Sequence, residues 1–135
     1  MYQLTELAIR LSDSQWEGQS FNCVPVPGDQ EVLQVTVSDW SEMPIYVTIT
    51  DVQILFIVYL FKKEEVKDDQ LNELNDRCLQ LNIPLPLAAF ATIEDQYTLF
   101  RALSTRATFE NIQEELVTLG ENAVEALEAL EEYLK

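Results

Sequence analysis

Residues 54–61 read ILFIVYLF, the longest uninterrupted apolar run of this 135-residue chain. Eight residues are too few for a membrane-spanning helix, which needs about 20. The run is rich in β-branched and aromatic side chains, and these favour a strand over a helix. Because both faces of such a strand would be apolar, the run predicts a strand at the centre of a sheet, covered on both sides.

Three shorter strands are predicted before this run. Residues 33–37 and residues 44–50 alternate apolar with polar side chains, which is the period of a half-buried strand. Residues 21–26 are also strand-like in composition, but Pro25 and Pro27 lack the N–H groups that a sheet ladder uses. The prolines therefore predict that residues 21–26 lie at a sheet edge.

Three helices are predicted from apolar positions that recur at intervals of three and four residues. The first covers residues 4–11. The second begins at Asp68 or Asp69, which can cap a helix, and ends at Asn82 and Pro84.

The third predicted helix begins at Thr108 as its N-cap and continues to the C-terminus. At 1.5 Å per residue, about 26 residues span about 39 Å, well above the mean helix length. Val117 and Val124 widen its apolar face. A long helix with a widened apolar face is expected to pack against a second copy of the chain, so a homodimer is predicted.

The remaining segment adds a hairpin, because residues 87–93 and 97–103 are strand-like and flank the turn Glu94-Asp95-Gln96. The predicted order is helix, three or four strands, helix, two strands, helix. Strands that follow one another in sequence usually pair, which predicts an α+β fold with a mainly antiparallel sheet and flanking helices. A single domain is expected over residues 1–135.

The charge is strongly negative and unevenly distributed. There are 24 acidic and 8 basic residues, giving −16. Residues 1–61 and residues 107–135 each carry a net charge of −7, whereas residues 62–106 carry −2. This charge disfavours direct binding to nucleic acid or to an anionic membrane. It would steer a cationic partner towards the protein, or it serves solubility alone.

The acidic end of the last predicted helix is the candidate partner-binding face. Exposed glutamates near a helix C-terminus interact unfavourably with the helix dipole, by roughly 0.3–1 kcal/mol each. The alternative is a solvated face on which the good helix propensity of glutamate prevails. The candidate residues are Glu121, Glu125, Glu128, Glu131 and Glu132.

The residues that most enzymes use are scarce. The chain has no histidine, which excludes Ser-His-Asp and Cys-His nucleophile systems. Two cysteines cannot form a four-cysteine zinc site, and no two of the three glycines have the spacing of a phosphate-binding loop. The clusters at residues 64–69 and 94–95 could bind a divalent cation, but capped helix starts and solvated turns are the commoner reading. We therefore predict no catalytic, cofactor-binding or metal-binding residue.

The compartment predicted from sequence is the cytoplasm. The first residues lack the basic and apolar regions of a signal peptide. Cys23 and Cys78 are too few for a disulfide framework and are expected to be small buried apolar residues.

Four aromatic residues lie near the predicted ends of elements. They could anchor a protein interface, but they are more often lids over a core. They are Tyr2, Trp16, Trp40 and Tyr133.

Over nearly its whole length the chain resembles the YjfI family of uncharacterised bacterial proteins, and the segments that carry the resemblance lie in its second half. The similar segments are LPLAAF at residues 85–90, YTLFRALS at residues 97–104 and LGENAVEA at residues 119–126. The family pattern would have glycine where Arg101 stands. The resemblance implies an operon neighbourhood with a PspA-like, membrane-associated coiled-coil protein. The element order is also similar to that of type III secretion chaperones and YbjN-like proteins, which bind other polypeptides.

Three functions follow from these observations. The first is a chaperone-like or adaptor protein without catalytic activity, which binds another protein through its sheet or long helix. The second is an acidic nucleic-acid mimic that blocks a DNA-binding protein, which requires carboxylates arrayed on one face. The third is a carboxylate-based or metal-dependent enzyme, which requires convergent acids in a pocket.

Overall fold

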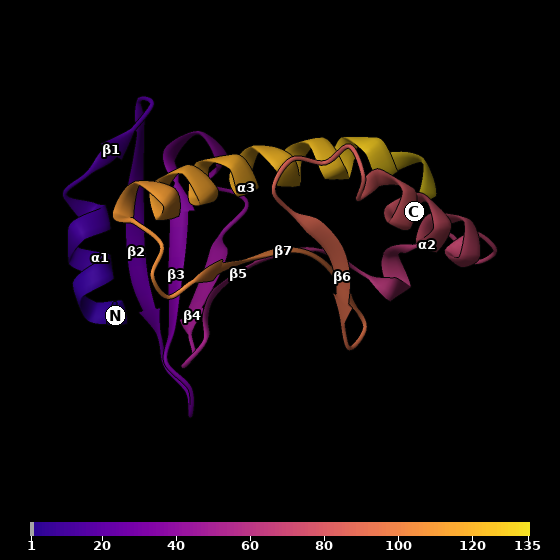
Figure 1. Cartoon of the computed structure of the whole chain (residues 1–135). Helices are drawn as coiled ribbons and strands as arrows, with labels where there is room; N and C mark the ends of the chain where they lie inside the picture. The colour runs from indigo at the N-terminus through magenta and orange to yellow at the C-terminus, as the bar shows by residue number, and fades with distance from the viewer. Residues whose placement is uncertain (1) are drawn as a thin grey trace.

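A computed structural model of the protein describes residues 2–135 (Figure 1). Over these residues seven strands form one antiparallel sheet in the order β1-β2-β3-β4-β5-β7-β6. The predicted α+β class and element order are confirmed, with one short strand added. The strands are β1 (Gln15–Trp16), β2 (Gln19–Val26), β3 (Val32–Val37), β4 (Ile45–Ile49), β5 (Gln53–Lys62), β6 (Ala89–Ile93) and β7 (Gln96–Ser104). The helices are α1 (Leu4–Ser12), α2 (Leu71–Leu81) and α3 (Phe109–Leu130), with 3-10 turns η1 (Ser38–Trp40), η2 (Lys63–Glu65) and η3 (Glu131–Tyr133).

The apolar run lies in β5, which pairs with β4 on one side and with β7 on the other. One face of β5 is fully buried, including Phe56 at 0% exposure. The opposite face carries Leu55 and Ile57, which are half-buried, and Tyr59, which is exposed. The prediction that β5 is covered on both sides is therefore wrong. Antiparallel sheets can leave one face in water, and here α1 and α3 both pack on the same face.

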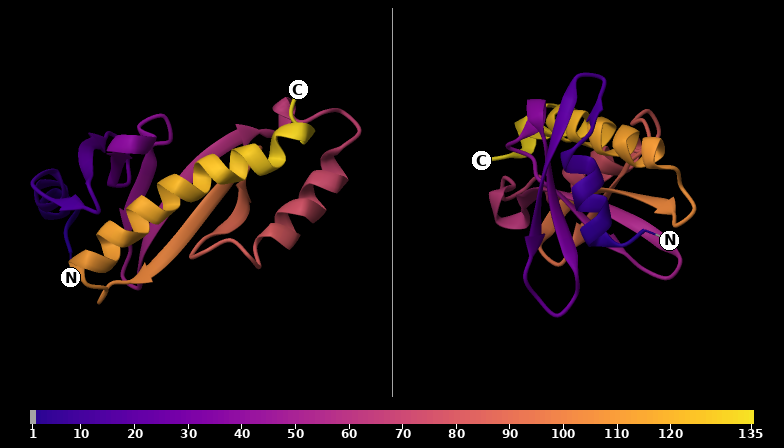
Figure 2. Two further views of the ribbon diagram at one scale, coloured as in Figure 1. Left: turned by 90° about the horizontal axis from the view of Figure 1, so that it is seen from above. Right: turned by 90° about the vertical axis from the view of Figure 1, so that its left-hand side faces the viewer.

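Helix α3 runs diagonally across the inner face of the sheet (Figures 1 and 2). Its predicted N-cap is confirmed, because the Thr108 hydroxyl accepts a hydrogen bond from the Asn111 N–H at 3.1 Å. The Asn111 side chain accepts one from the Thr108 N–H at 3.2 Å, so the cap is reciprocal. Although α3 is long, no helix among residues 2–135 has an apolar stretch that could cross a membrane.

The apolar face of α3 is covered by the protein's own sheet. Ile112, Leu116, Leu119 and Ala123 are all 0% exposed, in one core with the inner side chains of the sheet. A Cβ on Gly120 would lie 3.1 Å from the Trp40 ring, so the helix approaches η1 closely at this glycine. The prediction that this face packs against a second copy is wrong, because the sheet already occupies it.

The chain after α3 leaves the helical path. The helix was expected to reach the C-terminus but ends at Leu130. Beyond η3 the chain runs antiparallel to the segment before α2, where Val66 and Leu134 form an isolated bridge. The Lys67 N–H donates to the Tyr133 carbonyl at 2.8 Å. Pairing between two segments far apart in sequence gives no periodic signal, and so the sequence did not reveal it.

Helix α2 packs at one end of the sheet, beyond the main core, against side chains of β5 and β7 (Figure 2). It contributes Leu74 and Cys78 to a second apolar cluster, which also includes Leu130 at the end of α3. The predicted cap at Asp68 or Asp69 is wrong, since Gln70 is the N-cap and makes no side-chain cap bond. Helix α2 is therefore held by packing of Leu71, Leu74 and Cys78 in the second cluster, and no side chain caps its N-terminus.

The two edges of the sheet differ. Only the two-residue β1 lies outside β2, and α1 packs against β2, so residues 21–26 lie at the edge as predicted. At the other end β6 is the last strand. It begins at Ala89 rather than at residue 87, because Leu87 has a φ of +62°, in the left-handed region that strands do not use.

Candidate partner-binding surface

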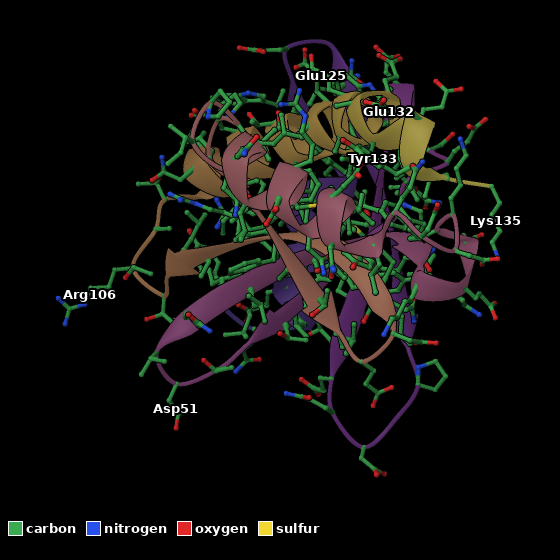
Figure 3. All side chains as sticks on the ribbon, turned by 90° about the vertical axis from the view of Figure 1, so that its right-hand side faces the viewer. Asp51, Arg106, Glu125, Glu132, Tyr133 and Lys135 are labelled. Atoms are coloured by element: carbon green, nitrogen blue, oxygen red, sulfur yellow. The ribbon has the colours of Figure 1, made fainter. Side chains whose placement is uncertain are left out.

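All five predicted glutamates are exposed. Glu121, Glu125 and Glu128 lie on one side of α3, because residues four and seven apart return to nearly the same angle at 100° per residue. Glu131 and Glu132 follow in η3. Glu132, four residues after Glu128, continues this line by the same spacing, whereas Glu131 does not. In Figure 3, Glu125 and Glu132 lie on the side of α3 away from the sheet.

Two further glutamates extend this line towards the start of the helix. Glu110 and Glu114 are exposed and lie at the same angle on α3. The sequence prediction left them out of the candidate face because its argument from the helix dipole applies to the C-terminal end, although the same period includes them. We call this line the acidic row; it comprises Glu110, Glu114, Glu121, Glu125, Glu128 and Glu132.

The acidic row has no ion pair within the part of the chain that the structure describes. The two ion pairs found there join Arg101 to Glu115 and Lys135 to Asp68. The last turn of α3 has no basic residue, so Glu128 also opposes the helix dipole without compensation. The row is therefore a line of negative charges with no counter-charge at ion-pair distance among the described residues.

A second carboxylate of α3 is in a different environment. Glu115 is 3% exposed and faces the sheet, where its Oε1 lies 3.5 Å from the Nε of Arg101 on β7. Neither of these two buried atoms makes a hydrogen bond within residues 2–135. Burial raises the pKa of Glu115 to about 7; the Arg101 charge lowers this pKa, and Glu114 raises it further. Burial thus outweighs the attraction of one partly exposed guanidinium.

The sequence prediction also missed the Glu115–Arg101 pair. The burial of Glu115 could have been predicted from helical spacing. Glu115 falls three residues after Ile112 and four before Leu119, which places it on the buried stripe of the helix. Arg101 pairs with Phe56 across β5 and β7, so its side chain starts from the inner face of the sheet.

Replacing Glu115 by glutamine should remove a pH dependence of stability. A carboxyl whose folded pKa is raised binds a proton in the folded state that the unfolded chain has lost, so stability falls as pH rises from about 4.5 to about 7. The shift corresponds to up to about 3 kcal/mol. Urea unfolding across this range should show wild type losing that much more stability than Glu115→Gln. Parallel pH profiles for the two proteins would contradict the assignment.

The four aromatic residues are lids rather than exposed anchors. Tyr2, Trp16 and Trp40 are half-buried against the main core, and Tyr133 is half-buried against the second cluster. The Tyr2 hydroxyl donates to the Ala107 carbonyl at 2.9 Å.

The acidic clusters considered for metal binding are dispersed. Glu65 Oε2 accepts the Lys62 N–H at 2.8 Å, and Asp68 pairs with Lys135. Among residues 2–135 no three potential ligands come together in a metal-binding group.

A groove of about 430 Å³ lies between α2 and the outer edge of β6. Its lining includes Leu71, Cys78, Phe90 and Tyr97. Burial raises the pKa of the Cys78 thiol to about 11, so the thiol is protonated at neutral pH and is a poor nucleophile. The Tyr97 hydroxyl donates to the Asn75 side chain, and both residues line the groove.

Comparison with known proteins finds one matching family model and a weakly similar relative. The model is that of DUF2170, described as an uncharacterized protein conserved in bacteria, and it matches residues 1–134. The protein YjfI of Escherichia coli (strain K12) is 24% identical over 113 residues, which cover 82% of this chain and 84% of the relative.

Two solved structures share the fold. The crystal structure of YbjN, a putative transcription regulator from E. coli, matches with a TM-score of 0.61 at 18% identity, over 95% of this chain and 93% of that chain. A chain of the heterodimeric ExoU–SpcU complex, from the type III secretion system of Pseudomonas aeruginosa, matches with a TM-score of 0.55 at 13% identity, over 98% of both chains. At these identities the similarity establishes the fold alone.

Proposed function

The chain belongs to the DUF2170 family of bacterial proteins, and from that premise we propose that it is a chaperone-like or adaptor protein that binds another polypeptide and catalyses no reaction. The observation that carries the proposal is the acidic row on α3. Five glutamates of α3, continued by Glu132 in η3, form an exposed row on a helix that is fixed on a sheet by its opposite face. A rigid helix presents such a row without further ordering, which lowers the entropic cost of binding.

The electrostatics of the row indicate the chemistry of the partner. Neighbouring glutamates on the row repel one another, and the ion pairs of the described chain leave this repulsion uncompensated. A partner with lysine and arginine side chains at matching intervals would relieve it and would be steered to the surface. We therefore propose a partner with a basic surface.

The fold supports a polypeptide partner. One structure with this fold is a chain of a heterodimeric complex, so the architecture can present a surface to another protein. The family resemblance adds a PspA-like coiled-coil protein as the first candidate to test. We also keep the homodimer in the proposal, although its interface is not the apolar face of α3.

The nucleic-acid mimic is a second candidate. It requires carboxylates on one face, and the acidic row meets that requirement along one helix. A duplex presents two rows of phosphates across a groove, however, and acids such as Asp29 and Asp51 lie in turns away from α3. Competition with duplex DNA for a captured partner would favour the mimic, and simultaneous binding of both would eliminate it.

The carboxylate enzyme is placed third. Glu115 has the raised pKa that general acid–base catalysis uses. Glu115 lies beneath α3 against Arg101, outside the groove between α2 and β6. The Cys78 thiol, which lines that groove, is poorly reactive because burial raises its pKa.

The proposal is tested by crosslinking and affinity capture with three proteins. The first is wild type, and the second carries Glu121→Gln, Glu125→Gln and Glu128→Gln. The control carries Asp29→Asn, Glu31→Gln and Asp51→Asn, which remove the same charge from exposed turns.

We expect wild type and control to capture the same partner and the α3 variant to lose most of it. An order of magnitude in affinity corresponds to about 1.4 kcal/mol, within reach of three lost charge contacts. Equal capture by all three proteins, or no partner for any of them at low salt, would contradict the proposal.

A further inference from the structure

Strand β7 extends past the start of β6, its neighbour on one side (Figure 1). On its other side β5 pairs with β7 as far as Ser104, whereas β6 pairs only with residues 96–100. Before β6 begins, the chain turns away from this side at Leu87, which has a φ of +62°. Residues 101–104 therefore form a further open edge of the sheet, which we call the free half of β7.

The hydrogen bonds of β6 show where the backbone groups of the free half point. Phe90 directs its N–H away from β7, to the Asn82 side chain, which accepts it at 2.7 Å. Phe90 and its partner Leu99 are therefore not a hydrogen-bonded pair. Bonding alternates along an antiparallel strand, so even-numbered residues of β7 bond to β6 and odd-numbered residues bond to β5. Ala102 is even-numbered, and its N–H and C=O point to the side that β6 leaves open.

The turn between β4 and β5 gives the same result independently. The Thr50 N–H donates to the Gln53 carbonyl at 2.9 Å, so odd-numbered residues of β5 bond to β4 and even-numbered residues bond to β7. Phe56 of β5 lies opposite Arg101, which places the bonds of β7 to β5 at odd positions. Ala102 thus has no strand to bond, and the backbone hydrogen bonds of the described chain give it no other partner.

Ser104 adds one more free group. It lies two residues after Ala102 and turns its N–H to the same side. Its carbonyl already accepts the Ala107 N–H at 3.0 Å. An incoming strand therefore finds three backbone groups to bond, which are the N–H and C=O of Ala102 and the N–H of Ser104.

A basic side chain borders this edge. Arg101 lies on the inner face of the sheet, and 39% of its side chain is exposed. Its Nε is buried and makes no hydrogen bond within residues 2–135, although the Glu115 carboxylate lies 3.5 Å away. Because Arg101 bonds to β5, a residue opposite it on an added strand would lie close, with Cα atoms about 4.5 Å apart and side chains on the same face. A carboxylate there matches the planar donors of the guanidinium.

The charge around the free half favours a negatively charged occupant. Residues 96–109 contain two arginines, Arg101 and Arg106, and no acidic residue. Arg106 is exposed in the turn after β7, and Figure 3 shows its side chain extending away from the protein. Glu115 offsets part of the Arg101 charge, but burial raises its pKa to about 7, so it is partly protonated at neutral pH.

We infer that the free half of β7 binds an extended segment of another protein, with an aspartate or glutamate opposite Arg101. None of the 24 acidic residues of this chain lies in a strand, so a folded second copy has no strand with a carboxylate to offer. The acidic row attracts lysine and arginine instead, so the two sites select segments of opposite charge. The inference goes beyond the proposed function and does not depend on it.

The test uses the purified full chain and three capped peptides of nine residues. Each peptide alternates threonine and valine, with glutamate, glutamine or lysine at its centre. At about 0.15 M salt, the glutamate peptide should bind about fivefold more tightly than the lysine peptide. It should also slow hydrogen exchange at the N–H groups of Ala102 and Ser104, measured by NMR. The Thr92 N–H, which points away from the sheet on β6, should exchange as before.

Three variants locate the site. Ala102→Pro removes a free N–H from an edge position, where proline is tolerated, and should abolish binding of all three peptides. Thr92→Pro makes the same change on the edge of β6 and should bind as wild type does. Arg101→Gln should still bind the glutamine peptide but lose the preference for glutamate over lysine. Circular dichroism checks that each variant is folded.

Three results would overturn the inference. They are no binding of any peptide at about 1 mM, equal affinity for the three peptides, and slower exchange at Thr92 with Ala102 unchanged. All three are measured on wild type, so misfolding of a variant cannot produce them. They leave the proposal for the acidic row unaffected, because its glutamates take no part in this binding.

Discussion

Arg101→Met is expected to lower the free energy of unfolding by about 1.5–2 kcal/mol at about pH 8, because Glu115, whose pKa is about 7, can take up a proton when its counter-charge is lost, and this limits the cost. The substitution leaves the Glu115 carboxylate buried without a counter-charge. Because the Arg101 side chain is 39% exposed, solvent also screens part of the attraction that is lost, which keeps the effect below the range for a fully buried ion pair. Urea unfolding followed by circular dichroism gives the difference directly.

The pH dependence identifies the cause. Arg101 lowers the pKa of Glu115, so removing Arg101 raises this pKa above about 7 and widens the range in which folding takes up a proton. At about pH 5 the carboxyl is protonated in the folded protein, and the cost of Arg101→Met should fall below about 1 kcal/mol. The double substitution Arg101→Met and Glu115→Gln should recover most of the stability at pH 8. A cost independent of pH would show that lost packing, rather than an unpaired charge, is responsible.

Phe56→Ala is expected to lower the free energy of unfolding by about 3–5 kcal/mol. Phe56 is 0% exposed at the centre of the sheet, beneath α3. Removing its ring leaves a cavity between the sheet and the helix that neighbouring side chains can fill only in part.

The matched control is the next residue of the same strand. Ile57 lies on the outer face of β5, between Tyr46 and Phe100 on the neighbouring strands, and is half-buried. Ile57→Ala should therefore cost clearly less than Phe56→Ala. Equal costs would indicate that the outer face is covered in solution, as the sequence alone had predicted.

Much of the fold could be predicted because its signals are local. The alternation in β3 and β4, the apolar run of β5 and the Thr108 cap are each visible within a few residues. The errors arise where distant parts of the chain decide the outcome. Whether the second face of β5 is covered depends on where the helices pack, and the bridge of Leu134 to Val66 depends on two segments that the sequence keeps apart.

The candidate surface could be predicted in part. The glutamates at the end of α3 are exposed as expected, and their period extends the row to Glu110. The role of Arg101 could not be predicted, because the two charges of its pair come together only when α3 crosses β7.

The central claim is that the acidic row binds a basic polypeptide. Its most direct test is titration calorimetry of the purified partner against three proteins, at low and at high salt. They are wild type, the α3 variant with Glu121→Gln, Glu125→Gln and Glu128→Gln, and the control with Asp29→Asn, Glu31→Gln and Asp51→Asn. The account predicts that wild type and control bind with equal affinity, which falls steeply as salt rises. The α3 variant should bind at least about tenfold more weakly at low salt and show a shallower salt dependence. The claim would be contradicted if the affinity of wild type did not change with salt and the α3 variant bound as tightly as wild type.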